Sequence, residues 1–302
     1  MTIDVKEVAQ DTYQIDCGKV PVFLMSQIAC WLVGESGSAL LEPGCTTAAA
    51  RFLDEANSLG LDTRTISYII PTHIHVDHGG GVGYLAERLP QAKVVLNPRG
   101  AANMRDPSRI ATGTGVAFGD KWEEYFGPIS PVPEGQILEV QDGESISLGN
   151  RDLTVIYTPG HATHHISILD SLIDGIYAGE ALGFPSDLSP DLVLPGGIPP
   201  FDAERYLESI EKVEGYAPKR IFYSHLGFYD NPDNRLIRLV KESATAFNQI
   251  VSRAVADGLD DRAISERLVE YLKNHAEGGL DDFLLDPSGY VDYYRRRAYP
   301  SG

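Results

Sequence analysis

Short apolar segments rich in β-branched and aromatic residues recur along the first 230 residues, and most of them end at Gly, Pro or Asn. Such segments are typical of strands that are buried in a sheet. The pattern predicts strands over residues 28–33, 38–41, 67–70, 93–96, 153–157, 166–169, 173–178 and 220–223.

Between these strands, apolar positions three and four residues apart predict helices over residues 46–59, 83–89 and 202–214. Thr46 or Thr47 is suited to cap the first helix, and Asp202 is suited to cap the third. Because strands and helices alternate throughout this part of the chain, we expect an α/β fold.

Two segments depart from this alternation. Residues 98–135 are rich in Gly and Pro and carry Trp122, Tyr125 and Phe126 without a clear period, which predicts an irregular insertion that covers a site. From residue 232 the pattern is helical only, with one helix ending at residues 257–258 and another at 278–279. We therefore predict a domain over residues 1–231 and a helical C-terminal appendage over residues 232–302.

Composition narrows the choice of partners. The 302 residues include 25 Lys and Arg against 43 Asp and Glu, which gives a net charge of -18. An acidic surface repels polyanions, so we expect a small-molecule substrate rather than nucleic acid or an anionic membrane. No apolar run reaches the ~18 residues of a membrane span and the first residues do not resemble a secretory signal, so we expect a cytoplasmic protein. Self-association into a homo-oligomer is left open.

The three cysteines, Cys17, Cys30 and Cys45, have unrelated spacings. This arrangement suits neither a disulfide framework nor a thiolate metal site, so we expect buried free thiols.

Four potential metal ligands occur within six residues, at His73, His75, Asp77 and His78. They follow an apolar strand and precede three glycines. Residues i and i+2 of an extended segment point the same way, so His73 and His75 can bind one ion. After the chain turns, Asp77 and His78 can bind a second. Three imidazoles clustered in this way would be costly to bury without a cation, so the segment predicts a metal site.

Further candidate ligands follow later strands, namely His161, Glu180 and His225. Successive strand ends converge at one edge of a sheet in open α/β folds, which is where these folds place their sites. Alone, His161 or His225 would more often be structural, but the preceding cluster makes each a candidate ligand. For His164 and His165 we expect a structural or supporting role.

The segments 72–80, 158–161, 179–180 and 224–225, in this order, resemble the metal motifs of the metallo-β-lactamase superfamily over about residues 10–230. The resemblance implies a four-layer αββα sandwich with a dinuclear site between the sheets. It also implies one ion on His73, His75 and His161, a second ion on Asp77, His78 and His225, and Glu180 bridging both beside a bound hydroxide. We expect two divalent ions, zinc first, with iron or manganese as alternatives.

Two acidic residues depart from the superfamily pattern. The position of Glu180 is usually Asp, and the alkylsulfatases, which also use Glu there, replace the ligand that matches His161 by a carboxylate. This chain keeps His161, which favours a dinuclear site, while a mononuclear one stays open. The segment 40–44 resembles the early Asp-x-Gly segment of the superfamily, with Glu42 in place of Asp.

Metal ions that share a hydroxide can hydrolyse an acyl bond without a covalent intermediate, and Asp77 is placed to orient that hydroxide and take its proton. We therefore predict a metal-dependent hydrolase of an ester, thioester or lactone. The ligand spacings resemble the glyoxalase II and lactonase branches, although Gly183 stands where quorum-sensing lactonases carry a Tyr that assists ring opening. Alternatives are a non-haem iron protein of the same fold, either persulfide dioxygenase-like or oxygen-binding, and a hydrolase of alkyl sulfates or phosphodiesters.

Overall fold

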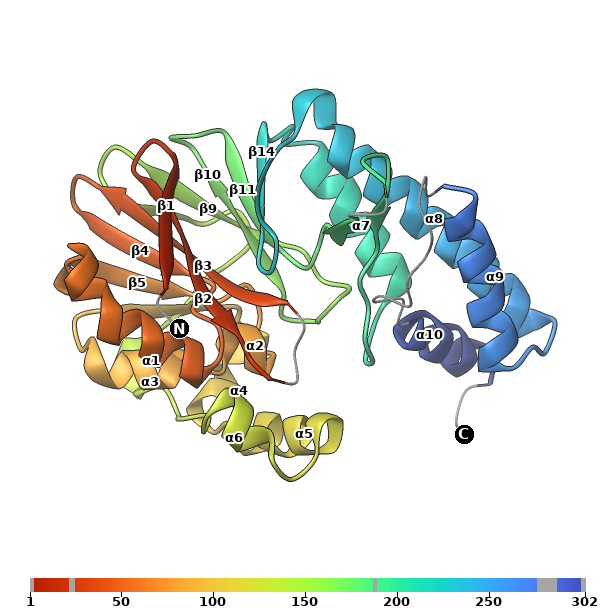
Figure 1. The fold of residues 1–302 in the computed structure, drawn as a ribbon, viewed down its shortest axis with the longest axis horizontal. Helices are drawn as coiled ribbons and strands as arrows, with labels where there is room; N and C mark the ends of the chain where they lie inside the picture. The colour runs from red at the N-terminus through yellow and green to blue at the C-terminus, as the bar shows by residue number, and fades with distance from the viewer. Residues whose placement is uncertain (1–2, 22–24, 187–188, 276–286, 300–302) are drawn as a thin grey trace. The chain divides into compact units, whose positions relative to one another are not determined.

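The structure is a computed structural model that describes residues 3–21, 25–186, 189–275 and 287–299. The chain forms two compact units (Figure 1). The first comprises Met1–Tyr157, His164–Gly179 and Arg220–Asp230, and the second comprises Thr158–Thr163, Glu180–Lys219 and Asn231–Gly302. This division cuts the chain at several positions, whereas the predicted domain boundary cuts it once, after residue 231. That boundary stays a prediction. None of the described helices combines the length and the hydropathy that a bilayer span needs.

The first unit contains a seven-stranded sheet with the order β1-β2-β3-β4-β5-β6-β7. Its first four strands pair antiparallel, and the pairs from β4 to β7 are parallel. The strands are β1 Asp4–Ala9, β2 Thr12–Lys19, β3 Ser26–Gly34, β4 Gly37–Leu41, β5 Ile66–Ile70, β6 Lys93–Leu96 and β7 Ile137–Glu139.

A second, six-stranded sheet of the same unit has the order β15-β14-β11-β10-β9-β8. Only the pair of β11 and β14 is parallel among its neighbours. The strands are β8 Ser145–Ser147, β9 Asp152–Tyr157, β10 Ile166–Asp170, β11 Gly175–Gly179, β14 Arg220–Tyr223 and β15 Gly227–Asp230.

The two sheets share an apolar core. Leu32, Leu41 and Ile70 of the first sheet pack in one cluster with Val155 and Ile168 of the second. The opposite face of the first sheet packs against α1 Thr46–Ala56 and α3 Val82–Arg88. The first unit therefore has the helix, sheet and sheet layers that the predicted sandwich requires, and the C-terminal helices of the prediction are present in the second unit.

Away from the histidines, Arg151 forms a buried ion pair and also connects the two sheets. The Arg151 guanidinium contacts the Asp170 carboxylate at 3.1 Å, and both side chains are fully buried. The other nitrogens of Arg151 donate to the Asp11 and Val33 carbonyls at 2.9 and 3.1 Å and to the Thr12 hydroxyl at 2.5 Å. Arg151 thus holds the β1–β2 turn and the end of β3 on the second sheet.

The prediction that residues 98–135 are irregular is wrong, because this segment contains α4 Pro98–Arg105, α5 Ser108–Phe118 and α6 Trp122–Phe126. That the segment is an insertion stays a prediction. Pro98 stands at the start of α4, and the Asn97 side chain accepts a hydrogen bond from the Arg99 N–H at 2.9 Å. Trp122 and Phe126 are buried in the core on the helical side of the first sheet. Glycines within α5 conceal its period in the sequence.

The second unit is mainly helical. Its helices are α7 Ala203–Glu214, α8 Arg235–Ala256, α9 Asp261–Lys273 and α10 Ser288–Ala298, and its strands β12 Phe184–Pro185 and β13 Val193–Leu194 form a hairpin. Asp202 caps α7 as predicted, accepting from the Arg205 N–H at 3.0 Å. The helix predicted to extend to residues 278–279 ends at Lys273, and residues 278–279 lie outside the described part of the chain.

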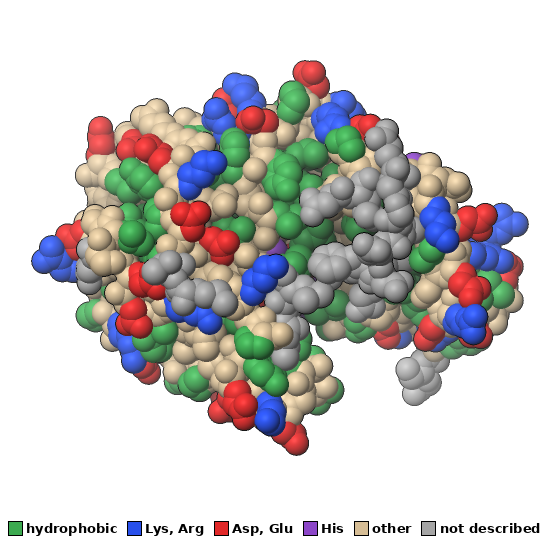
Figure 2. Space-filling model, viewed as in Figure 1, with side chains coloured by type: hydrophobic (Ala, Val, Ile, Leu, Met, Phe, Trp, Pro, Cys, Tyr) green, Lys and Arg blue, Asp and Glu red, His purple; other side chains and the backbone are tan. Residues whose placement is uncertain are grey.

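On the face drawn in Figure 2, acidic, basic and hydrophobic side chains are interspersed. The three cysteines are buried and free, as the sequence predicts.

Candidate metal centre

The histidine cluster lies at the end of β5. The chain leaves this strand after Ile70, passes through His73 and His75, and turns into α2 Val76–Gly79, which carries Asp77 and His78. Gly81 then brings the start of α3 against the segment before α1, because a Cβ atom there would lie 2.9 Å from the Cys45 carbonyl oxygen. The glycines after the histidines therefore allow a turn that a larger residue would block.

His73 and His75 face one another. Their Nε2 and Nδ1 atoms lie 2.9 Å apart, and their rings are 4.4 Å apart at an angle of 84°. Two nitrogens bound tetrahedrally to one zinc ion at 2.0–2.1 Å would be about 3.3 Å apart. The two imidazoles could therefore bind one ion after a small increase in the distance between their nitrogens.

Asp77 lies between two other histidines. Its Oδ2 atom is 3.4 Å from Nε2 of His78 and 3.4 Å from Nε2 of His225. His78 and His225 are almost fully buried, as is His73. A carboxylate and two imidazole nitrogens that converge in a buried position are the donor set expected for a divalent ion such as zinc.

The charge of Asp77 follows from these neighbours. Burial is the largest influence and by itself raises the pKa of Asp77, but His78 and His225 together lower this pKa by more. The pKa of Asp77 therefore lies well below its ordinary range, and the side chain is an anion at neutral pH.

Glu42 fixes the orientation of His78. Its Oε2 atom is 2.5 Å from Nδ1 of His78 and accepts from the Ser224 hydroxyl at 2.5 Å, while Oε1 accepts from the Thr72 N–H at 2.5 Å. These contacts join the ends of β4, β5 and β14. A carboxylate on Nδ1 selects the tautomer whose Nε2 carries a lone pair, which is the form that binds a metal ion.

The backbone of Glu42 and its ionisation both suit this role. Its φ is 54°, a left-handed conformation that ordinary residues rarely adopt. Burial raises the pKa of Glu42, but the adjacent His78 and the hydrogen bonds from Ser224 and Thr72 lower it by more, so this pKa lies below its ordinary range. The sequence suggested Glu42 only through its resemblance to an early acidic motif, and its contacts assign it a supporting role.

Hydrogen-bonding contacts also hold the rings of His225 and His73. Nδ1 of His225 lies 2.9 Å from the Ser26 carbonyl, and Nδ1 of His73 lies 3.1 Å from the Thr72 hydroxyl. In both rings Nε2 is left to face the cluster. A backbone carbonyl such as that of Ser26 has no signature in the sequence, so this contact could be found only in the structure.

His165 is buried beside His73, with ring centroids 5.1 Å apart. Its Nε2 atom and the Thr72 hydroxyl both approach Gly179, where an added Cβ atom would lie 2.5 Å from each. Gly179 also has a φ of 57°, so a side chain here would be strained and would displace the groups behind His73.

The other two predicted ligands, His161 and Glu180, belong to the second unit. Nδ1 of His161 lies 3.0 Å from Oε2 of Glu180, and both side chains are buried. The structure therefore groups His73, His75, Asp77, His78 and His225 in the first unit and pairs His161 with Glu180 in the second. The assignment of the last two to the metal centre stays a prediction.

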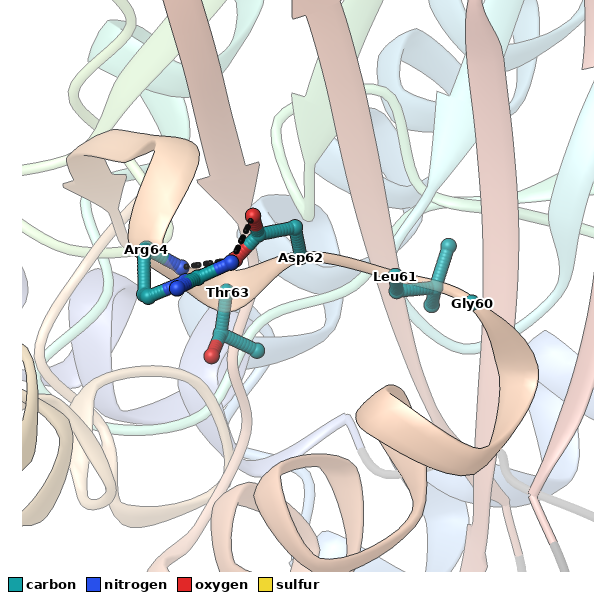
Figure 3. A pocket seen from close by; sticks show the side chains of 5 residues that line it. All are labelled: Gly60, Leu61, Asp62, Thr63 and Arg64. Atoms are coloured by element: carbon teal, nitrogen blue, oxygen red, sulfur yellow. Dashed lines mark hydrogen bonds and ion pairs between the residues drawn. The ribbon is translucent and has the colours of Figure 1, made fainter.

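A hollow lined by residues 60–64 precedes β5, at the end of that strand away from the histidines (Figure 3). Its polar side chains bind one another, since the Arg64 guanidinium donates two hydrogen bonds of 2.8 Å to the Asp62 carboxylate. Asp62 also caps the short turn Thr63–Thr65. These contacts explain the hollow as part of a turn, and we assign it no functional role.

Comparison with known proteins agrees with this picture. Residues 25–225 match the family model described as the metallo-beta-lactamase superfamily. The metallo-beta-lactamase fold-containing protein ST1585 of Sulfurisphaera tokodaii is 27% identical over 203 residues, which cover 65% of this chain and 71% of that protein. The crystal structure of ST1585 superposes with a TM-score of 0.63 at 20% identity and covers 94% of each chain, which shows a shared fold.

Two further relatives carry names that state an activity. Hydroxyacylglutathione hydrolase 1 of Vibrio vulnificus is 24% identical over 203 residues, which cover 67% of this chain and 63% of the relative. N-acyl homoserine lactonase AttM of Rhizobium radiobacter is 29% identical over 122 residues, which cover 39% of this chain and 40% of the relative. The match thus spans less than two thirds of both relatives.

Proposed function

Because the chain belongs to the metallo-beta-lactamase superfamily, we propose that it is a hydrolase that cleaves an ester or thioester with the help of two divalent metal ions. The observation that carries this proposal is the approach of Asp77 to the buried His78 and His225, with Glu42 holding His78 in a metal-binding tautomer. Two relatives named as hydrolases of acyl compounds support the same reaction class.

We assign the ligands by the order of the motifs. In this assignment His73, His75 and His161 would hold one ion, Asp77, His78 and His225 would hold the other, and Glu180 would supply a carboxylate to both. The donor set supports this assignment, since imidazole and carboxylate together suit zinc, iron and manganese. Zinc is the metal we propose first.

Bound ions would polarise the substrate carbonyl and lower the pKa of water, so that water can attack near neutral pH. Asp77 supplies a carboxylate that is already ionised, and we assign to it the role of orienting the attacking water and accepting its proton. Glu42 acts behind His78 and keeps the imidazole from turning. The buried histidines exclude bulk water, which strengthens each of these interactions.

An open-chain ester or thioester fits better than a lactone. The lactonases carry a Tyr at the position of Gly183, and in this chain a Cβ atom at Gly183 would lie 2.2 Å from the Leu194 carbonyl oxygen. Gly183 also has a φ of 63°. The β12–β13 hairpin therefore occupies the space that such a Tyr would need, and the chain lacks that route to ring opening.

A hydrolysis screen tests the proposal. Purified protein is assayed on a thioester, an aryl ester, a lactone, a phosphodiester and an alkyl sulfate ester, and its metal content is measured on the same sample. We expect ester or thioester turnover that is lost on chelation and restored by zinc. The variant His73→Gln should lose turnover, whereas exchange of the exposed His275 to Gln should not. Turnover that survives chelation, or activity confined to the phosphodiester or sulfate, would refute the proposal.

A further inference from the structure

His164 is a third histidine next to the ligand pair of the first unit. Its ring centroid lies 6.4 Å from that of His73, nearly parallel to it at 20°, and 6.4 Å from that of His75, at 77°. At such separations the rings are neighbours, so His164 lies directly beside His73 and His75. In the described part of the chain, His164 belongs to no group of side chains whose ligand atoms converge closely enough to hold a metal ion. It is therefore beside the proposed metal centre without being one of its ligands.

The backbone holds His164 in this place. It lies in the turn just before β10, where the Ile166 N–H donates to the Thr72 carbonyl at 2.8 Å. This bond ties the turn to the residue that precedes His73. His165 is fully buried, whereas His164 is half-buried, with its Nδ1 atom inside. Two successive histidines thus lie at different depths, and His164 is the one that solvent reaches.

Helix α4 covers another side of His164. A Cβ atom built on Gly100 would lie 3.5 Å from Cβ and 3.6 Å from Cγ of His164, and 3.4 Å from Ile74. The first turn of α4 therefore lies beside His164, with space for about one methyl group between Gly100 and the side chain. His164 therefore lies close both to the first turn of α4 and to the rings of His73 and His75 in the proposed metal centre.

We propose that His164 contacts the substrate and determines part of its specificity, by donating a hydrogen bond to an oxygen of the group being hydrolysed. This inference rests on the proposed hydrolase function. An acyl substrate offers such oxygens beside the scissile bond, and an imidazole N–H is a donor suited to them. Only hydrogen bonding is required of His164, and no proton is transferred to or from it.

Two variants separate this contact from a structural role. His164→Leu removes the donor and keeps an apolar side chain, whereas His164→Gln keeps an N–H donor. The control is His275→Leu at the exposed end of α9, far along the chain from the centre. Zinc content and kcat/KM on the best ester or thioester are measured for all four proteins. Loss of one neutral hydrogen bond should lower kcat/KM by about 3- to 10-fold in the Leu variant, with partial recovery in the Gln variant.

Binding supplies a readout that does not depend on turnover. Lactate, which offers carboxylate and hydroxyl oxygens, is titrated into the zinc-loaded proteins by calorimetry. We expect the Kd for lactate to rise by about the same factor in His164→Leu and to stay unchanged in His275→Leu.

The outcomes distinguish the two proposals. If the wild type hydrolyses none of the compounds but His164→Leu weakens lactate binding, the hydrolase function fails and the contact stands. If the wild type is active and the fully loaded Leu variant matches it in kcat/KM and in lactate affinity, the contact is wrong. Loss of zinc from the Leu variant, or the absence of lactate binding to the wild type, would also overturn the contact.

Discussion

Glu42→Gln should weaken metal binding although Glu42 is not a proposed ligand. The carboxylate accepts from the His78 ring, the Ser224 hydroxyl and the Thr72 N–H, all at 2.5 Å. A glutamine of the same shape has one acceptor oxygen and one NH₂ donor. If its oxygen faces His78 and Ser224, its NH₂ meets the N–H of Thr72; if the amide is reversed, the NH₂ meets the His78 donor. Either way two donors are forced together.

The size of the effect follows from these contacts. A buried donor that loses its acceptor costs about 1–3 kcal/mol, and Glu42 is only 6% exposed, so water cannot replace the lost partner. Loss of a partner that orients a metal-binding histidine typically lowers metal affinity about 10- to 100-fold. We therefore expect zinc affinity to fall by about this factor, and the metal-free protein to lose about 1–3 kcal/mol of stability.

Zinc affinity is measured by competition with a chromophoric chelator, and stability by the urea midpoint of the metal-free protein. Glu35→Gln is the matched control, because it makes the same chemical change at an exposed position, in the turn between β3 and β4. The control should change neither quantity. If Glu42→Gln binds zinc as tightly as the parent and unfolds at the same urea concentration, Glu42 does not orient His78 and this reasoning is refuted.

Three further changes test other parts of the structure. Asp77→Asn should keep the fold but lower kcat about 10²- to 10⁴-fold, because the amide keeps the shape without the basic oxygen; unchanged turnover at full metal occupancy would exclude the proposed role. Glu180→Gln should lower the metal content from about two ions toward one per chain, and elemental analysis that finds no change would contradict bridging. Arg151→Met should cost about 3–5 kcal/mol by leaving Asp170 buried without its partner; chemical denaturation measures this loss, and the double variant that adds Asp170→Leu should recover much of it.

Eight strands that line the core could be predicted from the sequence, whereas β2, which also contributes to the core, and the strands at the sheet edges could not. All eight predicted strands are present, as β3, β4, β5, β6, β9, β10, β11 and β14. Strands β1 and β15 lie at the edges of their sheets, and few of their residues are buried. An edge strand that buries little apolar surface carries little of the hydrophobic pattern on which the prediction depends.

The helices α4, α5 and α6 were missed for a different reason. Gly113 and Gly115 lie inside α5, and glycine is a poor helix former, so the segment resembles a loop. Packing overrides this preference. Ile110 and Phe118 of α5 pack against the core that contains Trp122 and Phe126. That these helices cover a site stays a prediction.

The proposed metal ligands could be predicted from the sequence because four of them fall in one short segment, where spacing alone indicates their geometry. The residues that hold them come from distant parts of the chain. Ser26 is 199 positions from His225, and Glu42 is 36 positions from His78 and 182 from Ser224. Only the pairing of strands brings such residues together, so a single sequence without contacts cannot reveal them.

This arrangement couples the metal centre to the core of the first unit. Glu42 links the end of β4 to β5 and to β14, and the Ile28 N–H donates to the Ser224 carbonyl at 3.2 Å, so residues from both sheets meet behind the histidines. An ion that binds these imidazoles only when the two sheets are packed in this way stabilises that packing by its binding free energy. The same coupling acts in reverse, because a loosened strand end releases His78 or His225 from the orientation that binds metal. Affinity for the ion therefore depends on the packing of the two sheets as well as on the ligands that touch it.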